Sequence, residues 1–192
     1  MKFNCMLNRI IRFLNIRKFK SLFKEFGDNS YIDKPLRIQG SSNITIKNNV
    51  RINQRAWLGS EPLTGMETSE LTIGSGCVIG DYNHIWATHC IVLENDVLTA
   101  NHVYISDNLH SYEDINVPII HQKILQKKDV IIGEGSWLGE NVCVIGASVG
   151  KHCVIGANSV VTRDIPDYSV AVGAPAKVIK HYDIILKKWV KV

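Results

Sequence analysis

The chain has no long apolar run and no strong excess of charge. Basic residues interrupt every apolar run near the N-terminus, whereas a membrane-spanning helix needs about 20 consecutive apolar residues and a secretory signal needs an apolar core. The formal net charge of the 192 residues is only +4, which gives no argument for nucleic-acid binding, although a local cluster could hold a polyanionic ligand. We therefore expect a cytoplasmic protein without a nucleic-acid partner.

Cysteines in a metal-binding or disulfide-forming pattern are also lacking. The five cysteines are odd in number and include no Cys-x-x-Cys pair, which is the spacing of many zinc and redox sites. Four of them occupy positions for small residues inside the repeats described next, and they are Cys77, Cys90, Cys143 and Cys153. We expect these four to be buried, reduced thiols.

Neither the helical period of 3.6 residues nor the strand period of 2 describes residues 73–106. An aliphatic residue instead recurs at every sixth position, namely Ile73, Ile79, Ile85, Ile91, Val97 and Val103. Such a period, with small or polar residues between the aliphatics, is typical of a parallel β-helix built from hexapeptides. Three hexapeptides form one triangular coil, so residues about eighteen apart should stack, with Ile73 under Ile91, Ile79 under Val97 and Ile85 under Val103. The aliphatic column then points inward.

The same period predicts an all-β solenoid over residues 31–176. Residues 59–70 break the period with Gly, Pro and Ser and should form a loop. Residues 107–129 form a longer excursion, which we expect to be an ordered loop because it contains apolar residues that can pack. The step of five from Val144 to Val149 predicts one shortened corner.

The two ends of the chain differ from the repeats. Residues 1–30 are predicted to be a basic amphipathic helical segment, with the helix itself over residues 2–26. This helix would pack on the end of the solenoid or on a neighbouring subunit, or would touch the inner face of an anionic membrane. Residues 177–192 form a C-terminal tail, in which residues 181–192 are expected to be a short helix or strand.

Where the repeats reach GANSVVTRDIPDYSVAVGAPAKVIK (156–180), the sequence resembles the hexapeptide-repeat acyltransferases. Within that family it is most similar to the sugar and polysaccharide O-acetyltransferases related to the maltose, galactoside and nodulation enzymes. The resemblance implies a left-handed β-helix and a homotrimer with active sites between subunits. It also implies acetyl-CoA as the donor and a sugar or polysaccharide precursor as the acceptor.

The resemblance also suggests a catalytic base. The segment VLTANHVYISDNLH matches in length the family segment that ends in the catalytic histidine, so His110 is expected to be the general base. A neutral imidazole can accept the proton of a sugar hydroxyl as its oxygen attacks the thioester carbonyl. A direct transfer of this kind needs no acyl-enzyme when both substrates are held together. The alternative is a solvated loop histidine without a role.

Side chains near His110 are candidates for acceptor binding. His84 and His102 are eighteen positions apart, as are Asn83 and Asn101, so each pair is predicted to stack on adjacent coils and to face one side. The alternative for the asparagines is a structural role at left-handed corners, and for the histidines it is packing at a subunit interface. Residues close to His110 in sequence could orient it or bind the acceptor, and these are Asp107, Tyr112 and Asp114.

The resemblance places the donor site near the last repeats. Lys177 and Lys180 are expected beside the phosphates of coenzyme A, which require cations. The remaining residues that the resemblance assigns to the cofactor groove are Trp137, Gly139, Glu140, Ala157, Thr162 and Arg163. The alternatives are a solvated tail for the lysines and interface packing for Trp137.

Other functions on the same scaffold remain open at this point. One is an acetyltransferase for serine or an antibiotic, and another is a β-helix that serves only as an assembly scaffold. A zinc enzyme of the γ-class carbonic anhydrase type is disfavoured, because the close pair His84 and His89 comes before the other histidines rather than after them. We therefore expect no metal.

Overall fold

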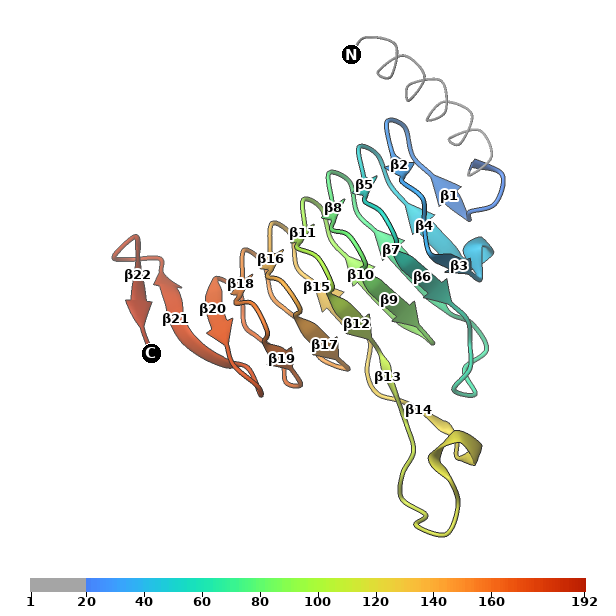
Figure 1. The fold of residues 1–192 in the computed structure, drawn as a ribbon. Coiled ribbons are helices and arrows are strands. Elements are labelled where there is room, and N and C mark those ends of the chain that lie inside the picture. Colours follow the sequence, from blue (N-terminus) through green and yellow to red (C-terminus); the bar gives the residue numbers. More distant parts are fainter. Residues whose placement is uncertain (1–19) are drawn as a thin grey trace.

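The computed structural model describes residues 20–192, and over these residues the strands form four sheets, three of which run along the molecule as the faces of a β-helix (Figure 1). Sheet A contains β1 (Glu25–Phe26), β4 (Ile44–Ile46), β7 (Glu70–Ile73), β10 (Cys90–Leu93) and β15 (Val130–Ile132). Sheet B contains β2 (Tyr31–Ile32), β5 (Arg51–Ile52), β8 (Val78–Ile79), β11 (Leu98–Thr99), β16 (Trp137–Leu138), β18 (Val154–Ile155), β20 (Ser169–Val172), β21 (Lys177–Asp183) and β22 (Lys188–Lys191). Sheet C contains β3 (Arg37–Gln39), β6 (Trp57–Ser60), β9 (His84–Ala87), β12 (Tyr104–Ser106), β17 (Cys143–Ile145) and β19 (Val160–Val161).

The aliphatic residues of the repeats fill the interior, as the sixfold period predicts. Along sheet C, Ile85, Ile105 and Val144 are register partners and are fully buried. The six aliphatics from Ile73 to Val103 are likewise buried, each at most 1% exposed. Burying one such side chain stabilises the fold by about 1.5–3 kcal/mol, so stacked coils supply the core that no single coil could form.

The length of a coil differs from the expectation. Ile73 lies beside Leu93, and Ile91 lies beside Leu71, so neighbours in these coils are twenty positions apart, as are Ser75 and Asn95 at the next corner. The predicted pairs of Ile73 with Ile91, Ile79 with Val97 and Ile85 with Val103 are therefore wrong. The reason is the corner between β9 and β10, where Thr88 and His89 lengthen the third side of the coil.

Coils near the C-terminus are shorter. Trp137 pairs with Val154 and Val144 with Val161, and the offset of seventeen positions recurs between Asn141 and Asn158 at the corner. At the corner after β17, Gly146 adopts a φ of 54° and the chain then reaches Val149, which bridges Ile132 and Ile165. The predicted shortened corner between Val144 and Val149 is confirmed. It accounts for the offset of seventeen, because the steps from Ile132 to Leu138 and from Leu138 to Val144 are still six.

The N-terminal helix predicted over residues 2–26 lies mostly outside the described residues, which begin at Lys20. From residue 21 onward the prediction is wrong, because residues 21–24 form turns and bends and residues 25–26 form β1. β1 pairs with β4, and the side chains of Phe23 and Phe26 are buried. These residues therefore belong to the first coil. In the described part of the chain, no helix is long and apolar enough to cross a membrane.

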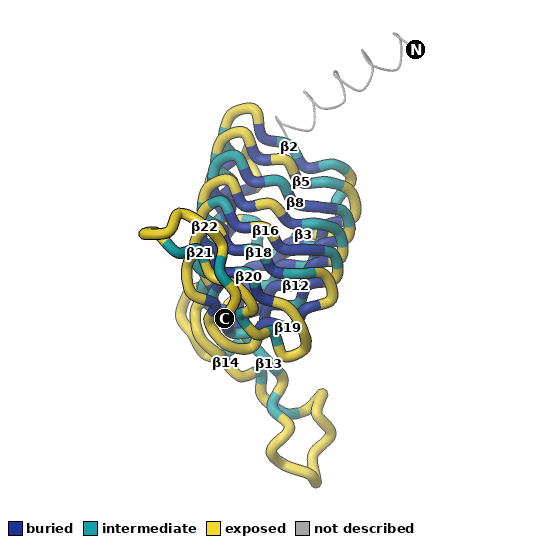
Figure 2. The backbone as a smooth tube through the Cα atoms, turned by 90° about the vertical axis from the view of Figure 1, so that its left-hand side faces the viewer, coloured by how far each residue is buried: buried dark blue, intermediate teal, exposed yellow. Residues whose placement is uncertain are grey.

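Three segments leave the regular coils. Residues 61–69 form the predicted loop between β6 and β7, which also contacts η1 (Ser41–Asn43) through Asn43. Residues 107–129 form an ordered arm that projects from the solenoid (Figure 2), with the antiparallel strands β13 (Asn108–His110) and β14 (Ile124–Gln126) at its base and η2 (Ile119–His121) near its tip. The C-terminal tail forms β21 and β22, an antiparallel hairpin that follows β20.

Candidate functional site

A cavity of about 310 Å³ lies on the outer face of sheet C, where the arm begins. Its walls come from the three central strands of the sheet, the loop after β6 and both strands of the arm. His110 ends β13 opposite Ile124 and stands exposed at this cavity. The lining residues are Trp57, Leu63, His84, Trp86, Tyr104, Asn108, Leu109, His110 and Ile124. The cavity therefore joins His84 and His110, two residues that the sequence analysis selected.

The register of the strands places a column of aromatic rings along the floor of this cavity. Trp57, His84 and Tyr104 are partners on β6, β9 and β12, so their side chains point outward from the same level of the coil. The rings of Trp57 and His84 stack at 4.1 Å with 9° between their planes, and Tyr104 lies tilted 5.1 Å from His84. On the other side Arg37 lies 4.7 Å from the Trp57 ring. The imidazole of His84 is thus held in one orientation.

Trp86 forms the second wall, and a glycine makes room for it. It meets Trp57 edge-on at 5.8 Å between centroids and His84 at 6.3 Å. Its partner on β6 is Gly59, and a Cβ added there would lie 2.1 Å from Trp86 Cε3. Only glycine at position 59 lets the indole lie against the backbone of β6.

The environment of His84 keeps its imidazole neutral. Burial lowers the pKa of His84 from its ordinary value of 6.5, because the charged form loses hydration. Within the described residues, its Nε2 atom is buried without a hydrogen-bond partner, and so is Oδ1 of Asn83 next to it. Buried polar atoms are normally paired, so these two atoms are unsatisfied polar groups beneath the floor of the cavity.

Asp107 has a structural task rather than a place in the cavity. Its side chain is fully buried, and its carboxylate accepts hydrogen bonds from the backbone N–H groups of Thr88, His89 and Cys90 at 2.7–3.0 Å. The hydroxyl of Thr88 also donates to it, at 2.8 Å. The carboxylate therefore closes the long corner after β9, and within the described residues it makes no hydrogen bond to His110. A contact of Asp107 with the acceptor stays a prediction.

The base of the arm is fixed by Gln126. Its Nε2 atom donates to the backbone oxygen of Asp107 at 3.0 Å, and its Oε1 atom accepts from the hydroxyls of Thr64 and Thr88. These bonds tie β14 to the coil and to the loop after β6. The position of His110, two residues beyond this clamp on the paired strand, is therefore determined by the solenoid.

Tyr112 lies away from His110. It is 65% exposed and lines a different hollow near the tip of the arm, together with Asp114 and Ile115. The Asp114 carboxylate accepts from the backbone N–H of Asn116. Among the described residues, the ring of His110 has no hydrogen-bond partner, so nothing in this part of the chain orients its imidazole.

The predicted stacking of His84 with His102, and of Asn83 with Asn101, is wrong because adjacent coils here are offset by twenty positions, as Asp81 and Asn101 are. His102 stacks on Tyr82 at 5.0 Å, and both occupy left-handed corners with φ of 57°. Asn101 accepts from the backbone N–H of Asp81 at 2.8 Å. Both residues thus belong to the corner between sheets B and C, not to the cavity. Asn83 is buried, and its amide donates to the backbone oxygen of Ala100.

The residues expected to bind the donor fall into three groups. On the outer face of sheet B, Trp137 and Lys180 lie on one ladder with two valines between them, and Lys177 pairs with Val172. At the corner between sheets B and C, a Cβ on Gly139 would lie 2.8 Å from the backbone of Ala157, and Glu140 accepts from the Asn101 N–H. Thr162 and Arg163 follow β19 and are exposed. Close packing of coils by itself accounts for the glycine at 139.

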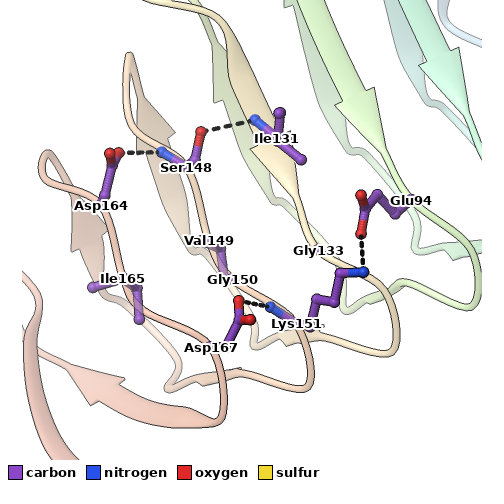
Figure 3. A pocket seen from close by; sticks show the side chains of 10 residues that line it. All are labelled: Glu94, Ile131, Gly133, Ser148, Val149, Gly150, Lys151, Asp164, Ile165 and Asp167. Atoms are coloured by element: carbon purple, nitrogen blue, oxygen red, sulfur yellow. Dashed lines mark hydrogen bonds and ion pairs between the residues drawn. The ribbon is translucent and has the colours of Figure 1, made fainter.

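A second hollow, of about 280 Å³, lies over the shortened coils on the side of sheet A (Figure 3). Its charged groups already have partners: Asp164 and Asp167 accept from the backbone N–H groups of Ser148 and Lys151, both at 2.8 Å, and the Lys151 ammonium lies 4.0 Å from Glu94. The ammonium of Lys128 bonds to Asp164 and lowers the pKa of that carboxyl. This hollow is therefore a surface crease closed by its own ion pairs, without a free group for chemistry.

Residues 20–192 contain four of the five cysteines. Cys77, Cys90, Cys143 and Cys153 are free thiols, as expected, although only Cys77 and Cys153 are buried. Burial raises the pKa of Cys77 to about 11, so this thiol is unreactive at neutral pH. In that range no three His, Cys, Asp or Glu side chains gather in a way that could hold a metal ion.

Sequence reasoning missed the aromatic walls Trp57, Trp86 and Tyr104. Each directly neighbours an inward aliphatic, so each was recognisable as an outward position. With the observed offset of twenty positions between coils, His84 and Tyr104 fall on one ladder. The assumed spacing of eighteen residues between coils did not predict that alignment. The loop over residues 61–69 lengthens the coil after Trp57, so the position of Trp57 beside His84 could not be predicted by counting.

Comparison with known proteins gives three likenesses. The hexapeptide repeat of succinyl-transferase matches residues 129–163. A probable acetyltransferase of Mycobacterium tuberculosis is 38% identical over 133 residues, which are 69% of this chain and 44% of that protein. The putative lipopolysaccharide biosynthesis O-acetyl transferase WbbJ of Escherichia coli is 38% identical over 120 residues, 59% of this chain and 61% of that protein.

Among solved structures, a variant of the N-acyltransferase AntD from Bacillus cereus, in complex with dTDP and coenzyme A, has a TM-score of 0.72 at 21% identity, with 88% of this chain and 90% of that chain covered. At that identity the likeness shows the fold. This chain spans 44% and 61% of the two curated relatives. The repeats, the three-sided β-helix and these likenesses agree, and the chain belongs to the hexapeptide-repeat acetyltransferase family.

Proposed function

We propose that this protein is an acetyl-CoA-dependent O-acetyltransferase that acetylates a hydroxyl group of a sugar or a polysaccharide precursor. The observation that carries the proposal is the cavity on sheet C, where an exposed imidazole, His110, faces an aromatic floor that includes His84. The relative from Escherichia coli, whose name describes an O-acetyl transferase of lipopolysaccharide biosynthesis, supports a hydroxyl acceptor. We place the activity in the cytoplasm and assign the coil the left-handed sense of the family.

The reaction follows from the position of His110. Its neutral imidazole accepts the proton of the acceptor hydroxyl while the oxygen forms a bond to the thioester carbonyl carbon. The tetrahedral intermediate then expels the thiolate of coenzyme A, which takes the proton from the imidazolium. The products are an acetyl ester and free coenzyme A, and His110 returns to its neutral form.

The walls of the cavity suit a sugar. The apolar face of a pyranose ring packs on indole and phenol rings, while its hydroxyl groups need a few polar partners. Trp86 and Tyr104 offer ring surface, and the imidazole of His110, which is exposed at the cavity, offers one polar contact. Asn108 lies at the edge of the same cavity, where its amide nitrogen donates to Oδ1 of Asp107 at 3.1 Å.

We further propose a homotrimer in which a neighbouring subunit covers the cavity and brings the donor to His110. The arm supports this, because Ile115 and Ile120 near its tip are 93% and 81% exposed, and exposed aliphatics on a projecting element usually meet a partner. Acetyl-CoA would then lie along sheet B of that subunit, with Lys177 and Lys180 near its phosphates. Light scattering coupled to size exclusion should give three times the mass of the 21.5 kDa chain.

The proposal is tested by incubating the protein with acetyl-CoA and a panel of free, lipid-linked and nucleotide-linked sugars. We expect thiol release that depends on one class of sugar, and a product that gains one acetyl group and loses it in mild alkali, as an ester does. An alkali-stable product would identify an amide and hence an amine acceptor. No transfer, together with no thermal shift on adding acetyl-CoA, would leave the scaffold function.

A further inference from the structure

The turn of the C-terminal hairpin has a composition that turns rarely have. β21 and β22 are joined by Ile184, Ile185, Leu186 and Lys187, whereas short turns favour Gly, Asn, Asp, Pro and Ser. The three aliphatics are 72%, 91% and 57% exposed. The backbone N–H groups of Ile185 and Leu186 donate to Oδ1 of Asp183 at 2.9 and 2.8 Å. The turn is therefore well formed and presents its aliphatics to solvent.

Lysines are concentrated in this hairpin, with Lys187 and Lys188 next to the tip. Residues 177–192 contain five lysines and one aspartate, a local charge of +4 that equals the formal charge of the whole chain. Among residues 20–192, none of these five lysines takes part in an ion pair. Lys180 and Lys191 are also direct partners across the hairpin, an arrangement in which like charges repel. The hairpin thus carries a positive charge that lacks a counter-charge nearby.

Aromatic side chains complete the pattern just behind the tip. Trp189 is 44% exposed and meets Tyr182 edge-on across the hairpin at 5.6 Å. The hairpin thus has an aliphatic tip, indole and phenol rings behind it, and lysines whose long stems can reach outward. This order matches the layers of a lipid interface, which run from acyl chains to phosphates.

We propose that the tip of this hairpin, residues 184–189, docks on an anionic lipid surface. Ile184, Ile185 and Leu186 enter the region between acyl chains and headgroups, Trp189 lies at headgroup level, and Lys187 and Lys188 contact lipid phosphates. The charge argues against the other simple occupant, a second copy of the hairpin, because two segments of charge +4 repel each other. Binding of this kind is peripheral and reversible, since it combines a small apolar area with a few cations.

Vesicle co-sedimentation tests the proposal, with phosphatidylcholine alone compared with phosphatidylcholine containing phosphatidylglycerol. We expect binding to the anionic vesicles only, weakened by salt. Ile185→Ser should lower the partition coefficient about tenfold, and the pair Lys187→Gln with Lys188→Gln roughly tenfold or more. The matched controls are Leu36→Ser, which removes another exposed aliphatic (58%), and the pair Arg51→Gln with Arg55→Gln; both should bind like the native chain.

A second measurement locates the contact. Lipids brominated near the headgroup should quench tryptophan fluorescence in the native chain and much less in Trp189→Phe. Binding that survives both hairpin variants would place the contact elsewhere, for example in residues 2–26, and would overturn the proposal. So would hairpin variants that change the molar mass of the assembly, because the hairpin would then be a subunit contact.

Discussion

At the residue scale, the shape and lining of the cavity depend on which outward-facing positions of sheet C are aromatic residues. His84 is held between Trp57 and Tyr104, and burial lowers its pKa. A neutral His84 beside the proposed base has a simple advantage, since a second positive charge would disfavour the imidazolium that forms on His110 during proton transfer.

The lowered pKa of His84 predicts how stability responds to acid. The unfolded chain protonates this imidazole as the pH falls through 6.5, whereas the folded chain does so only at lower pH. Because the unfolded state binds more protons in that window, the free energy of unfolding falls as the pH drops from about 7.5 to 5. In His84→Phe, which keeps a ring against Trp57, this part of the loss should vanish, so thermal unfolding should shift less with pH. An equal shift in both chains would contradict a depressed pKa.

Gly59 and Trp86 give a second prediction at this scale. A methyl group at position 59 would lie 2.1 Å from Trp86 Cε3, so Gly59→Ala should displace the indole and lower the free energy of unfolding by about 1–3 kcal/mol. In a Trp86→Ala background the same change should cost less than about 0.5 kcal/mol, because the obstacle is gone. Chemical denaturation of the four chains measures this cycle. A cost that is the same in both backgrounds would mean that the β6 backbone, not the indole, resists the methyl group.

At the scale of elements, the arm is positioned by the corner beneath it. The carboxylate of Asp107 accepts hydrogen bonds from the backbone N–H groups of Thr88, His89 and Cys90. The residues that directly follow Asp107 form β13. The arm therefore starts from a rigid corner, which is the condition for holding His110 at a fixed place beside sheet C.

Asp107→Asn tests this structural task. The substitution turns one acceptor oxygen into a donor that faces backbone N–H groups, so we expect the free energy of unfolding to fall by about 3 kcal/mol. Asp114→Asn, on the exposed part of the same arm, is the control and should cost less than about 1 kcal/mol. At temperatures where the variant is folded, its KM for the acceptor should be unchanged. A stable Asp107→Asn chain with a raised acceptor KM would instead return Asp107 to the acceptor site.

The C-terminal strand β21 carries the proposed donor contacts. Lys177 and Lys180 lie at its start, next to the last parallel strand of sheet B. If they hold the 3′-phosphate, the pair Lys177→Gln with Lys180→Gln should raise the KM for acetyl-CoA several-fold, and much less for the thioester of dephospho-CoA. The two donors serve as each other's control. Equal effects on both would remove the lysines from the 3′-phosphate.

At the scale of the whole molecule, a period of six was enough to predict the architecture. The inward aliphatics, the breaks at residues 59–70 and 107–129 and the shortened corner all follow from positions counted along the chain, because a solenoid repeats one local rule. The sugar acetyltransferase motifs near the C-terminus, with GAPAKVIK at residues 173–180, pointed to the family in the same way.

The sixfold period alone could not predict how many residues form one complete coil. Two extra residues, Thr88 and His89, lengthen one corner without disturbing the sixfold step from Ile85 to Ile91. Because of these two residues, the register partner of His84 in the next coil is Tyr104 and not His102. They also form the corner whose backbone N–H groups bond to Asp107. Site residues on a β-helix are brought together between coils, so a small error in the length of each coil changes every neighbour while leaving the fold correct.

The most direct test of the account compares two histidines of the arm in the acetyl-transfer assay. His110 lines the cavity, and His121 lies in η2 near the exposed tip. We predict that His110→Ala lowers kcat by about 10²–10⁴-fold, the usual contribution of a general base, with little change in the KM for acetyl-CoA. His121→Ala should turn over like the native chain. Undiminished turnover in His110→Ala would contradict the proposed mechanism, whatever the acceptor proves to be.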